Sequence, residues 1–309
     1  MGSKNKLLII GGTGFIGSYL TNEALSRGFE VTVLSLNNKK VNKNSKNVDF
    51  LFADIANLEK LSKVLNKNLF HHVVNLGGYI NHTNFSKGGN KIFDVHFKGL
   101  YNLINCLNHP ELRSFIQIGS SDEYGSNNAP QSENQRELPF SPYSAAKTAS
   151  TYLLQMLNKT ENFPAVILRP FLVYGPGQDK NRFIPQIIYG CLENNEFPVT
   201  QGEQLRDFCY IDDFVNAIFS SFENNNAFGE VINIASGRPI LVKEIVSMIQ
   251  NIIGAGVPKF GQIPYRVDEN MELYADISKA NKLLNWTPKI NLESGLTTTI
   301  EFQKENINI

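Results

Sequence analysis

The sequence predicts an α/β fold, a doubly wound parallel sheet followed by a smaller C-terminal lobe. Short, near-continuous apolar runs alternate with amphipathic stretches through the first half of the chain. A glycine-rich turn directly follows the first run, and the regular alternation ends after Pro170. Continuous apolar strands that alternate with helices are typical of a parallel sheet that helices cover on both faces, so these three observations favour that architecture.

The predicted elements follow one another in strand–helix order. Apolar runs predict strands at residues 7–10, 31–34, 48–52, 72–76, 115–118 and 165–168. The amphipathic stretches between them predict helices at residues 19–26, 58–65, 92–107 and 145–157. In the second half, residues 231–235 predict a strand and residues 241–252 a helix. We therefore expect a sheet domain at residues 1–170, with residues 208–240 packing back on it, and a lobe made mainly of residues 171–309.

The composition limits the classes of partner. The chain of 309 residues carries 29 basic and 29 acidic side chains, a balance that supplies no field to attract nucleic acid or an acidic membrane. Cys106, Cys191 and Cys209 are widely spaced and odd in number, which argues against a disulfide framework and a metal cluster. No apolar run reaches the length of a membrane span and no signal peptide is visible, so a cytoplasmic location is expected.

The turn after the first predicted strand has the spacing of a nucleotide-binding loop. Gly11, Gly14 and Gly17 stand where a strand gives way to a helix. Glycines at this spacing permit a tight turn and let backbone N–H groups approach a pyrophosphate. We therefore expect a Rossmann dinucleotide site. The expected cofactor contacts of the turn are Gly11, Thr13, Gly14, Phe15, Ile16 and Gly17.

The end of the second predicted strand discriminates between the two dinucleotides. NAD sites commonly place a carboxylate there to bind the ribose 2′-hydroxyl. Residues 35–40 contain Ser35, Asn37 and Lys39 but no carboxylate. Hydroxyl, amide and ammonium groups suit a 2′-phosphate, so NADP(H) is favoured as the cofactor, NAD(H) is the alternative, and these three residues are expected contacts. Solvent exposure explains the lysines nearly as well, so the missing carboxylate carries more weight.

A tyrosine and a lysine stand at the start of the fourth predicted helix. Tyr143 and Lys147 are four residues apart and therefore share one helical face. An ammonium beside a phenol stabilises the phenolate, which should bring the pKa of Tyr143 toward neutral pH. The spacing alone is common in helices. It gains weight from the nucleotide turn upstream and from the serines that follow the strand at residues 115–118.

Together these motifs resemble the extended short-chain dehydrogenase/reductase family, in its nucleotide-sugar branch of NAD-dependent epimerases and dehydratases. The resemblance covers nearly the whole chain and includes GGTGFIG at 11–17, YSAAK at 143–147, LRPFLVYGPGQ at 168–178, QLRDFCYIDD at 204–213 and YADISKANKLLNWTP at 274–288. It implies that Ser120, Tyr143 and Lys147 are catalytic. It also implies that the further cofactor contacts are Asp54, Ile55, Leu76, Gly77, Gly78, Pro170, Tyr143 and Lys147.

The resemblance implies a nucleoside-diphosphate sugar as the substrate. The expected substrate contacts are Tyr79, His82, Ser121, Asp122, Arg182, Arg206 and Arg266. Arginines pair strongly with phosphates, which is the physical reason for Arg206 and Arg266. Residues 1–170 would then bind the dinucleotide and residues 171–309 mainly the nucleotide sugar. The resemblance further implies a homodimer through the predicted helix at 92–107 and the helix that carries Tyr143.

The stretch GSSDEYG at residues 119–125 resembles that of GDP-4-keto-6-deoxy-mannose reductases. Aligned with the family, Ser120 takes the position of the catalytic serine or threonine. If the extended geometry persists, strand alternation puts Ser120 and Asp122 on one face and Ser121 and Glu123 on the other. Asp122 is then a substrate contact and Glu123 structural. His96 stands where the family commonly has asparagine, and a buried, satisfied histidine is the favoured interpretation of it.

The leading prediction is an NADPH-dependent reduction of the C4 keto group of a nucleoside-diphosphate-4-keto-6-deoxy sugar. The alternatives are a 4,6-dehydratase or a 4-epimerase with tightly bound NAD. Many dehydratases carry an acid and a base where this chain has Ser121 and Asp122. A non-catalytic NADP-binding protein is a more distant alternative, since such a protein has no need of Ser120, Tyr143 and Lys147 together. No metal is expected at the site.

Overall fold

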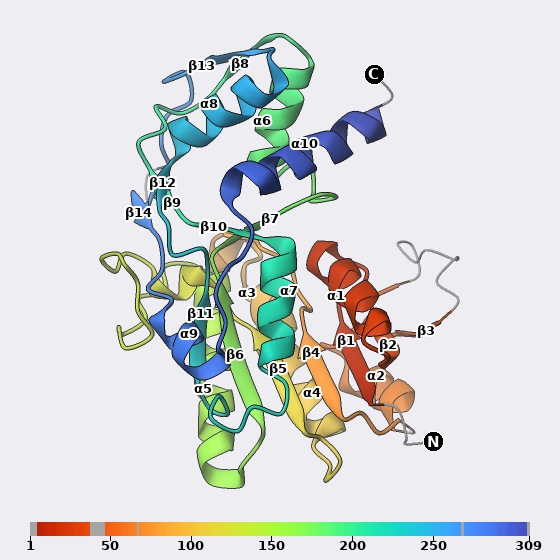
Figure 1. Ribbon diagram of the computed structural model, residues 1–309. Helices are drawn as coiled ribbons and strands as arrows, with labels where there is room; N and C mark the ends of the chain where they lie inside the picture. Colours follow the sequence, from red (N-terminus) through yellow and green to blue (C-terminus); the bar gives the residue numbers. More distant parts are fainter. Residues whose placement is uncertain (1–4, 38–46, 67, 267–268, 308–309) are drawn as a thin grey trace.

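Figure 1 shows the computed structural model of the chain, in which helices cover a parallel sheet and a second group of helices lies beyond one edge of it. The structure describes residues 5–37, 47–66, 68–266 and 269–307. The seven strands of the sheet are all parallel. Their order is β11-β6-β5-β4-β1-β2-β3, so the predicted doubly wound sheet is confirmed. The bounds are Lys6–Ile10 (β1), Glu30–Ser35 (β2), Val48–Phe52 (β3), His72–Asn75 (β4), Ser114–Ile118 (β5), Ala165–Pro170 (β6) and Val231–Ile234 (β11).

Side chains of the strands alternate between two apolar layers. In β1, Leu7 and Ile9 pack in one layer, whereas Leu8 and Ile10 pack in the other. Helices α1 and α7 belong to the first layer, and α2, α4 and α5 to the second. Both faces of the sheet are therefore apolar, which is why its strands are near-continuous apolar runs in the sequence. The bounds are Phe15–Ser26 (α1), Leu58–Leu65 (α2), Gly99–Leu107 (α4), Pro142–Glu161 (α5) and Ile211–Ser220 (α7).

The order of the sheet reverses at β1. The chain runs from β1 outward through β2 and β3, and then returns to build β4, β5 and β6 on the other side of β1. In such a sheet the carboxyl ends of the two strands at the reversal, here β1 and β4, border a crevice where ligands bind. The register places Ile10 at the end of β1 beside Asn75 at the end of β4.

The predicted helix at residues 92–107 is interrupted. It consists of α3 (Asn90–Phe93), one π-helical segment, η2 (Asp94–Lys98), and α4. Single π turns occur frequently at functional sites. His96 lies in this turn with its side chain buried, and its Nε2 atom is 3.0 Å from the carbonyl oxygen of Tyr79. This agrees with the interpretation of His96 as a buried, satisfied histidine.

Helix α7 and strand β11 return to the sheet domain, and most other elements of the second half form a separate group. Helix α7 packs beside α1, and β11 adds the edge strand next to β6. In Figure 1 the second group lies above the sheet, at the end opposite the N-terminus. Its helices are α6 (Phe183–Leu192), α8 (Val242–Ile253) and α10 (Leu292–Ile307), while α9 (Ser278–Leu284) lies against β11.

The remaining strands are short and form small sheets separate from the seven-stranded sheet. Strands β7 and β10 pair in parallel, as do β8 and β13, and β9 lies between β12 and β14. The bounds are Leu172–Tyr174 (β7), Glu196–Pro198 (β8), Leu205–Arg206 (β9), Phe208–Tyr210 (β10), Ile240–Leu241 (β12), Val257–Lys259 (β13) and Glu272–Leu273 (β14).

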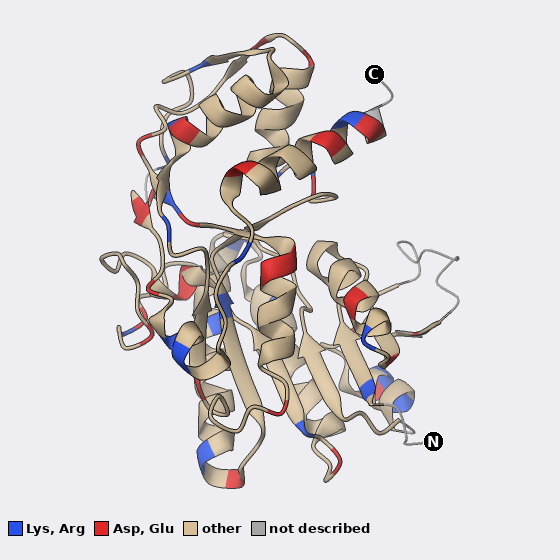
Figure 2. Cartoon of the chain, in the orientation of Figure 1, with Lys and Arg blue, Asp and Glu red and all other residues tan. Residues whose placement is uncertain are grey.

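Charged residues are interspersed through the molecule. Figure 2 shows acidic and basic positions on both the sheet domain and the upper group of helices, without a region of one sign. In the part of the chain that the structure describes, no helix combines the length and apolar character needed to cross a membrane.

The glycine turn between β1 and α1 is closely packed. Gly11 has a φ of +78°, which favours glycine. A Cβ atom at Gly17 would lie 2.5 Å from the carbonyl oxygen of Gly11, so α1 approaches the turn closely only because residue 17 has no side chain. At Gly14, with a φ of −82°, the nearest atom would be 3.3 Å from a Cβ atom.

We therefore expect Gly17→Ala to lower the free energy of unfolding by about 1–3 kcal/mol, the usual cost of overpacking. The matched variant Gly14→Ala should cost less than about 1 kcal/mol because its Cβ atom meets open space on most sides. Urea unfolding of the two variants measures both values. Equal losses would show that the close approach of α1 to the turn is not the constraint.

Candidate active site

Ser120, Tyr143 and Lys147 lie together at the carboxyl edge of the sheet. Ser120 follows β5 after one residue, and the other two stand in the first two turns of α5. Helix α5 begins at this point because Pro142 occupies its first turn and the Ser141 hydroxyl accepts a hydrogen bond from the Ser144 N–H. The Tyr143 hydroxyl is hydrogen-bonded to the Ser120 side chain.

Lys147 is held by the strand and not by the tyrosine. Its Nζ atom donates a 2.6 Å hydrogen bond to the carbonyl oxygen of Ile118, at the end of β5, and lies 5.9 Å from the centre of the Tyr143 ring. Burial lowers the pKa of Lys147 to about 8, and the charge of Glu123 partly opposes this shift.

The expectation that Lys147 lowers the pKa of Tyr143 is wrong for this structure. Burial raises the pKa of the Tyr143 phenol above its usual value, while its hydrogen bond with Ser120 acts in the opposite direction. The physical reason is that desolvation of the phenolate outweighs a distant ammonium that is already engaged by a carbonyl. In this state Tyr143 is a protonated phenol.

Ser120 is positioned by Glu123. Strand β5 ends at Ile118, and residues 121–124 form one 3₁₀ turn, η3 (Ser121–Tyr124). The alternation of side chains expected for an extended strand therefore does not continue through these residues. Ser120 caps this turn, and the Oε1 atom of Glu123 accepts a 2.8 Å hydrogen bond from the Ser120 N–H. The turn leaves Glu123 fully buried and Asp122 at the edge of the site.

The buried Glu123 carboxylate joins three elements. Its Oε2 atom accepts hydrogen bonds from the Thr151 hydroxyl on α5, at 2.8 Å, and from Arg169 on β6, at 2.7 Å. Arg169 is also fully buried and donates a second hydrogen bond, at 2.6 Å, to Glu137. These contacts agree with the structural role predicted for Glu123.

Asp122 faces a histidine across the site. Its Oδ2 atom lies 3.6 Å from Nε2 of His82, and both side chains are partly exposed. Burial raises the pKa of Asp122 above its usual value, whereas His82 and then Arg182 and Arg266 act to lower it. His82, Asp122, Arg182 and Arg266 are four of the predicted substrate contacts. Ser121, the neighbour of Asp122, is buried.

The predicted cofactor contacts lie along the same edge of the sheet. The Thr13 and Ser35 hydroxyls, from the glycine turn and the end of β2, are 3.0 Å apart. After β4, the Gly77 N–H donates to the Asn75 side chain, and a Cβ atom at Gly78 would lie 2.2 Å from the His96 ring. Three further predicted contacts also lie at strand ends or in the loops that follow: Ile55, Leu76 and Pro170. Lys39 lies outside the described residues.

The glycine turn fits a dinucleotide diphosphate. Gly14 is the N-cap of α1 and supplies no side-chain cap, so the N–H groups of the first turn keep their capacity to bind an anion. Glycines at 11 and 17 leave space that a Cβ atom would fill. Asp54, a predicted cofactor contact after β3, uses its Oδ1 atom to accept a hydrogen bond from the Ala56 N–H. The hollow beside it is lined by Asp54, Ala56, Asn57, Leu58, Tyr79, Lys91, Asp94, Val95 and Lys98.

Arg206 is engaged within the upper group of elements. It lies on β9, largely buried, and forms an ion pair with Glu269. Glu269 is not among the residues predicted from the sequence, although its position three residues after Arg266 is a detectable signal. Among the described residues, no group of three or more potential ligands could hold a metal ion.

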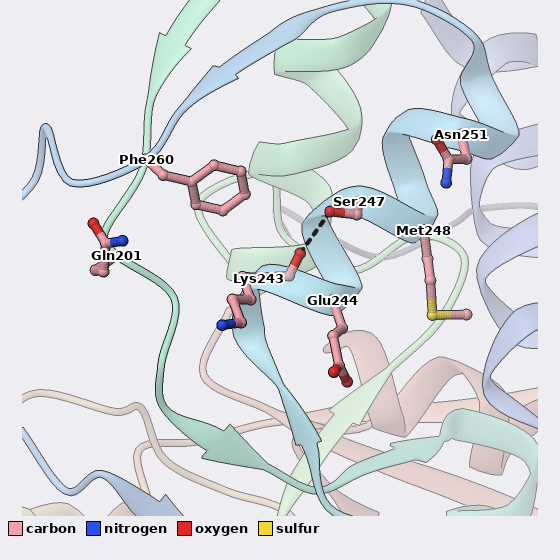
Figure 3. Close-up of a pocket in the computed structure, with 7 residues that line it drawn as sticks. All are labelled: Gln201, Lys243, Glu244, Ser247, Met248, Asn251 and Phe260. Atoms are coloured by element: carbon pink, nitrogen blue, oxygen red, sulfur yellow. Dashed lines mark hydrogen bonds between the residues drawn. The ribbon is translucent and has the colours of Figure 1, made fainter.

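A second hollow lies in the upper group and is separate from these residues. Figure 3 shows it between α8 and the segments that carry Gln201 and Phe260. Its other lining residues, Lys243, Glu244, Ser247, Met248 and Asn251, all come from α8, and the Ser247 hydroxyl donates a hydrogen bond to the Lys243 carbonyl. The predicted site residues do not line it.

We expect Arg169→Met to lower the free energy of unfolding by about 3–5 kcal/mol, because it leaves the carboxylates of Glu123 and Glu137 buried without a cation. The control is Lys63→Met, since Lys63 pairs with Glu59 on the exposed face of α2. That variant should change stability by less than about 0.5 kcal/mol. Chemical denaturation measures both, and a similar loss in the two variants would contradict this role of Arg169.

His96 should make stability depend on pH. Burial, reinforced by the charge of Lys147, lowers the pKa of His96 to about 3. The unfolded state therefore takes up the proton first, so the stabilisation is complete above pH 6.5 and is lost as the pH falls from 6.5 toward 3. The loss is at most about 1.4 kcal/mol per pH unit.

Replacing His96 with asparagine should flatten this part of the profile. The free energy of unfolding of His96→Asn and of the unsubstituted protein, measured from pH 7 to pH 4, gives the comparison. His72, whose pKa burial lowers to about 4, is present in both proteins, so the difference isolates His96. Parallel profiles of the two proteins would contradict the assignment of this pH dependence to His96.

Comparison with known proteins identifies the family. Residues 7–235 match the NAD dependent epimerase/dehydratase family. The chain is 27% identical over 317 residues to UDP-glucuronate 4-epimerase of Thermodesulfobacterium geofontis, covering 98% of this chain and 97% of that protein. It is 26% identical over 339 residues to dTDP-glucose 4,6-dehydratase of Shigella flexneri, covering 98% and 94%.

Solved structures agree with these matches. The UDP-glucuronic acid 4-epimerase of Bacillus cereus, in complex with UDP-glucuronic acid and NAD, superposes with a TM-score of 0.87 at 29% identity, over 97% of this chain and 99% of that one. The epimerase Mth375 of Methanothermobacter thermautotrophicus has the same fold, with a TM-score of 0.90 at 24% identity, over 99% and 94%. The chain therefore belongs to the NAD-dependent epimerase/dehydratase family of oxidoreductase-type enzymes.

Proposed function

We propose that this protein oxidises the C4 hydroxyl of a nucleoside-diphosphate hexose with a tightly held NAD and completes a 4,6-dehydration or a 4-epimerisation. The observation that carries this proposal is the meeting of Ser120, Tyr143 and Lys147 at the carboxyl edge of the sheet, beside the glycine turn. The named relatives are epimerases and dehydratases, and the Bacillus cereus structure contains NAD. These matches favour the retained-cofactor reactions over the ketoreductase predicted from the sequence.

Each of the three residues has a role at C4. The Ser120 hydroxyl, bonded to the Tyr143 hydroxyl, would bind the C4 oxygen, and Tyr143 would take the proton of that oxygen as a phenolate. The positive charge of a bound NAD would favour this phenolate over the protonated form that burial favours without cofactor. Lys147, whose pKa is lowered to about 8, supplies a buried positive charge one helical turn away. The nicotinamide of a bound dinucleotide supplies hydride acceptance and return.

The residues around the site suggest how the substrate is held. Residues 1–170, with 208–240, would bind the dinucleotide, and residues 171–309 would hold mainly the nucleotide diphosphate. Arg206 and Arg266 are the proposed phosphate contacts, and Tyr79, His82, Ser121, Asp122 and Arg182 the proposed sugar contacts. Glu269 would have to release Arg206 from their ion pair when a phosphate binds.

A homodimer through α4 and α5 is part of the proposal. Each helix presents large side chains to the surface, including Tyr101 on α4 and Tyr152 and Met156 on α5, which are about half exposed in the single chain. The cytoplasmic location stays a prediction.

A single reduction by NADPH is the second candidate. Two observations favour it: burial keeps Tyr143 protonated, as a proton donor to a C4 alkoxide must be, and the end of β2 presents the Ser35 hydroxyl beside that of Thr13. The resemblance to GDP-4-keto-6-deoxy-mannose reductases stays a prediction, as does the preference for NADP(H).

The cofactor content of the purified protein separates the candidates. We expect bound NAD in the protein as purified, and conversion of UDP-glucose, UDP-glucuronate or dTDP-glucose without added cofactor. Stoichiometric consumption of added NADPH with a 4-keto-6-deoxy sugar nucleotide, and no conversion of the three hexose nucleotides, would instead establish the reductase.

Tyr143→Phe should lower kcat by about 10²–10⁴-fold, because it removes the proton-transfer group at C4. Tyr189→Phe, which removes a hydroxyl bonded to Gln303 on the far side of the upper group, should leave kcat within twofold. Product formation by each variant, followed by nuclear magnetic resonance, is the measurement. Undiminished turnover by Tyr143→Phe would refute the assignment of the catalytic residues.

A further inference from the structure

A histidine and a carboxylate form a second group of proton-handling side chains beside Tyr143. His82 lies in the loop between β4 and the short 3₁₀ turn η1 (Phe85–Lys87), whereas Asp122 lies in η3. Their nearest atoms, Nε2 and Oδ2, are 3.6 Å apart. The His82 ring stands edge-on to the Tyr143 ring, with centroids 5.8 Å apart, so the pair lies next to the C4 chemistry without belonging to it.

Contacts with Ser141 and Phe140 orient the His82 ring. Its Nδ1 atom is 3.4 Å from the Ser141 hydroxyl at the start of α5, and its ring stacks on Phe140 with an interplanar angle of 14°. A hydrogen bond from the Nδ1–H group to the Ser141 hydroxyl oxygen would keep the proton on Nδ1 and leave Nε2, the atom that faces Asp122, to gain and lose a proton. The side chain is 38% exposed, so it can exchange protons with water.

The carboxylate of Asp122 has fewer partners than the carboxylate of the neighbouring Glu123. The oxygens of Glu123 are taken by the Ser120 N–H, Thr151 and Arg169. Asp122 keeps 26% of its side chain exposed and meets His82 by an ion-pair contact only. The other charged or titratable groups that act on Asp122 are Glu123, Arg182, Arg266 and, through its phenol, Tyr143. Asp122 is therefore available to a substrate.

We propose that His82 and Asp122 form an acid–base couple that acts on the sugar beyond C4, with His82 as a catalytic acid. This inference rests on the proposed function and selects dehydration within it. Ser121, in the position where many dehydratases carry an acid, is a buried hydroxyl that does not ionise near neutral pH. His82 supplies from another loop the second proton-transfer group that an elimination needs.

The step balances within the proposed reaction. Once C4 is a ketone, the C5 proton is acidic; the Asp122 carboxylate takes it, the C5–C6 double bond forms and the C6–O6 bond breaks. O6 leaves as water with a proton from Nε2 of the His82 imidazolium, which becomes a neutral imidazole. A bound nicotinamide would return to C6 the hydride taken from C4, and Asp122 gives its proton to C5. The proton taken by Tyr143 passes to water, from which His82 recovers one.

The test separates C4 oxidation from elimination. The enzyme is mixed with UDP-glucose and dTDP-glucose in D₂O, and three signals are followed: absorbance of reduced nicotinamide, deuterium at C5 and the 4-keto-6-deoxy product. Asp122→Asn should lower both C5 exchange and product formation by about 10²-fold or more. His82→Gln should lower product formation to a similar extent but keep more of the C5 exchange, because it removes the acid and not the base.

Both variants should still reduce the nicotinamide, which also shows that they fold and bind. His109→Gln is the control, because His109 lies before β5 at the opposite edge of the sheet, and it should behave as the unsubstituted protein. Full product formation by either variant, or a wild-type product that is only the 4-epimer without C5 deuterium, would overturn the couple and leave C4 oxidation standing. No nicotinamide reduction by the wild-type protein would overturn the proposed function and the couple together.

Discussion

The buried carboxylate of Glu123 is the interaction on which the site depends. A charge removed from water must be paired and hydrogen-bonded, and the partners of Glu123 come from three elements: the Ser120 backbone after β5, Thr151 on α5 and Arg169 on β6. Satisfying this one group therefore fixes the end of β5 against the helix that carries Tyr143 and Lys147. The placement of Ser120, Tyr143 and Lys147 is therefore tied to how the core accommodates a buried ion.

The sheet explains why so many functional groups meet along one edge. Every strand of a parallel sheet ends on the same side, so the glycine turn after β1, the loop after β4 and the turn after β5 are neighbours although they are far apart in the chain. The upper group of helices lies at the end opposite the N-terminus, over this edge (Figure 1). A dinucleotide on the sheet and a sugar nucleotide under the upper helices would therefore meet at Tyr143.

Desolvation sets the proton chemistry of this edge. It raises the pKa of Tyr143 and Asp122 and lowers that of Lys147 and His96, which in each case favours the neutral form. The pKa of Lys147, lowered to about 8, is thereby brought close to neutral pH. Asp122 also has a histidine partner, His82, at 3.6 Å.

The sequence by itself determined the sheet, the glycine turn and the placement of Tyr143 and Lys147 on one helical face, because these features follow from local periodicity and short spacing. Only the tertiary structure decided the rest. The 3₁₀ turn after Ile118 replaces the extended strand that was expected to continue from Ser120 to Glu123. Desolvation raises the pKa of Tyr143, whereas the sequence predicts a lowered pKa. The contacts of His82 with Asp122 and of Arg206 with Glu269 join loops distant in the chain, and no local pattern encodes such contacts because packing of the whole fold creates them.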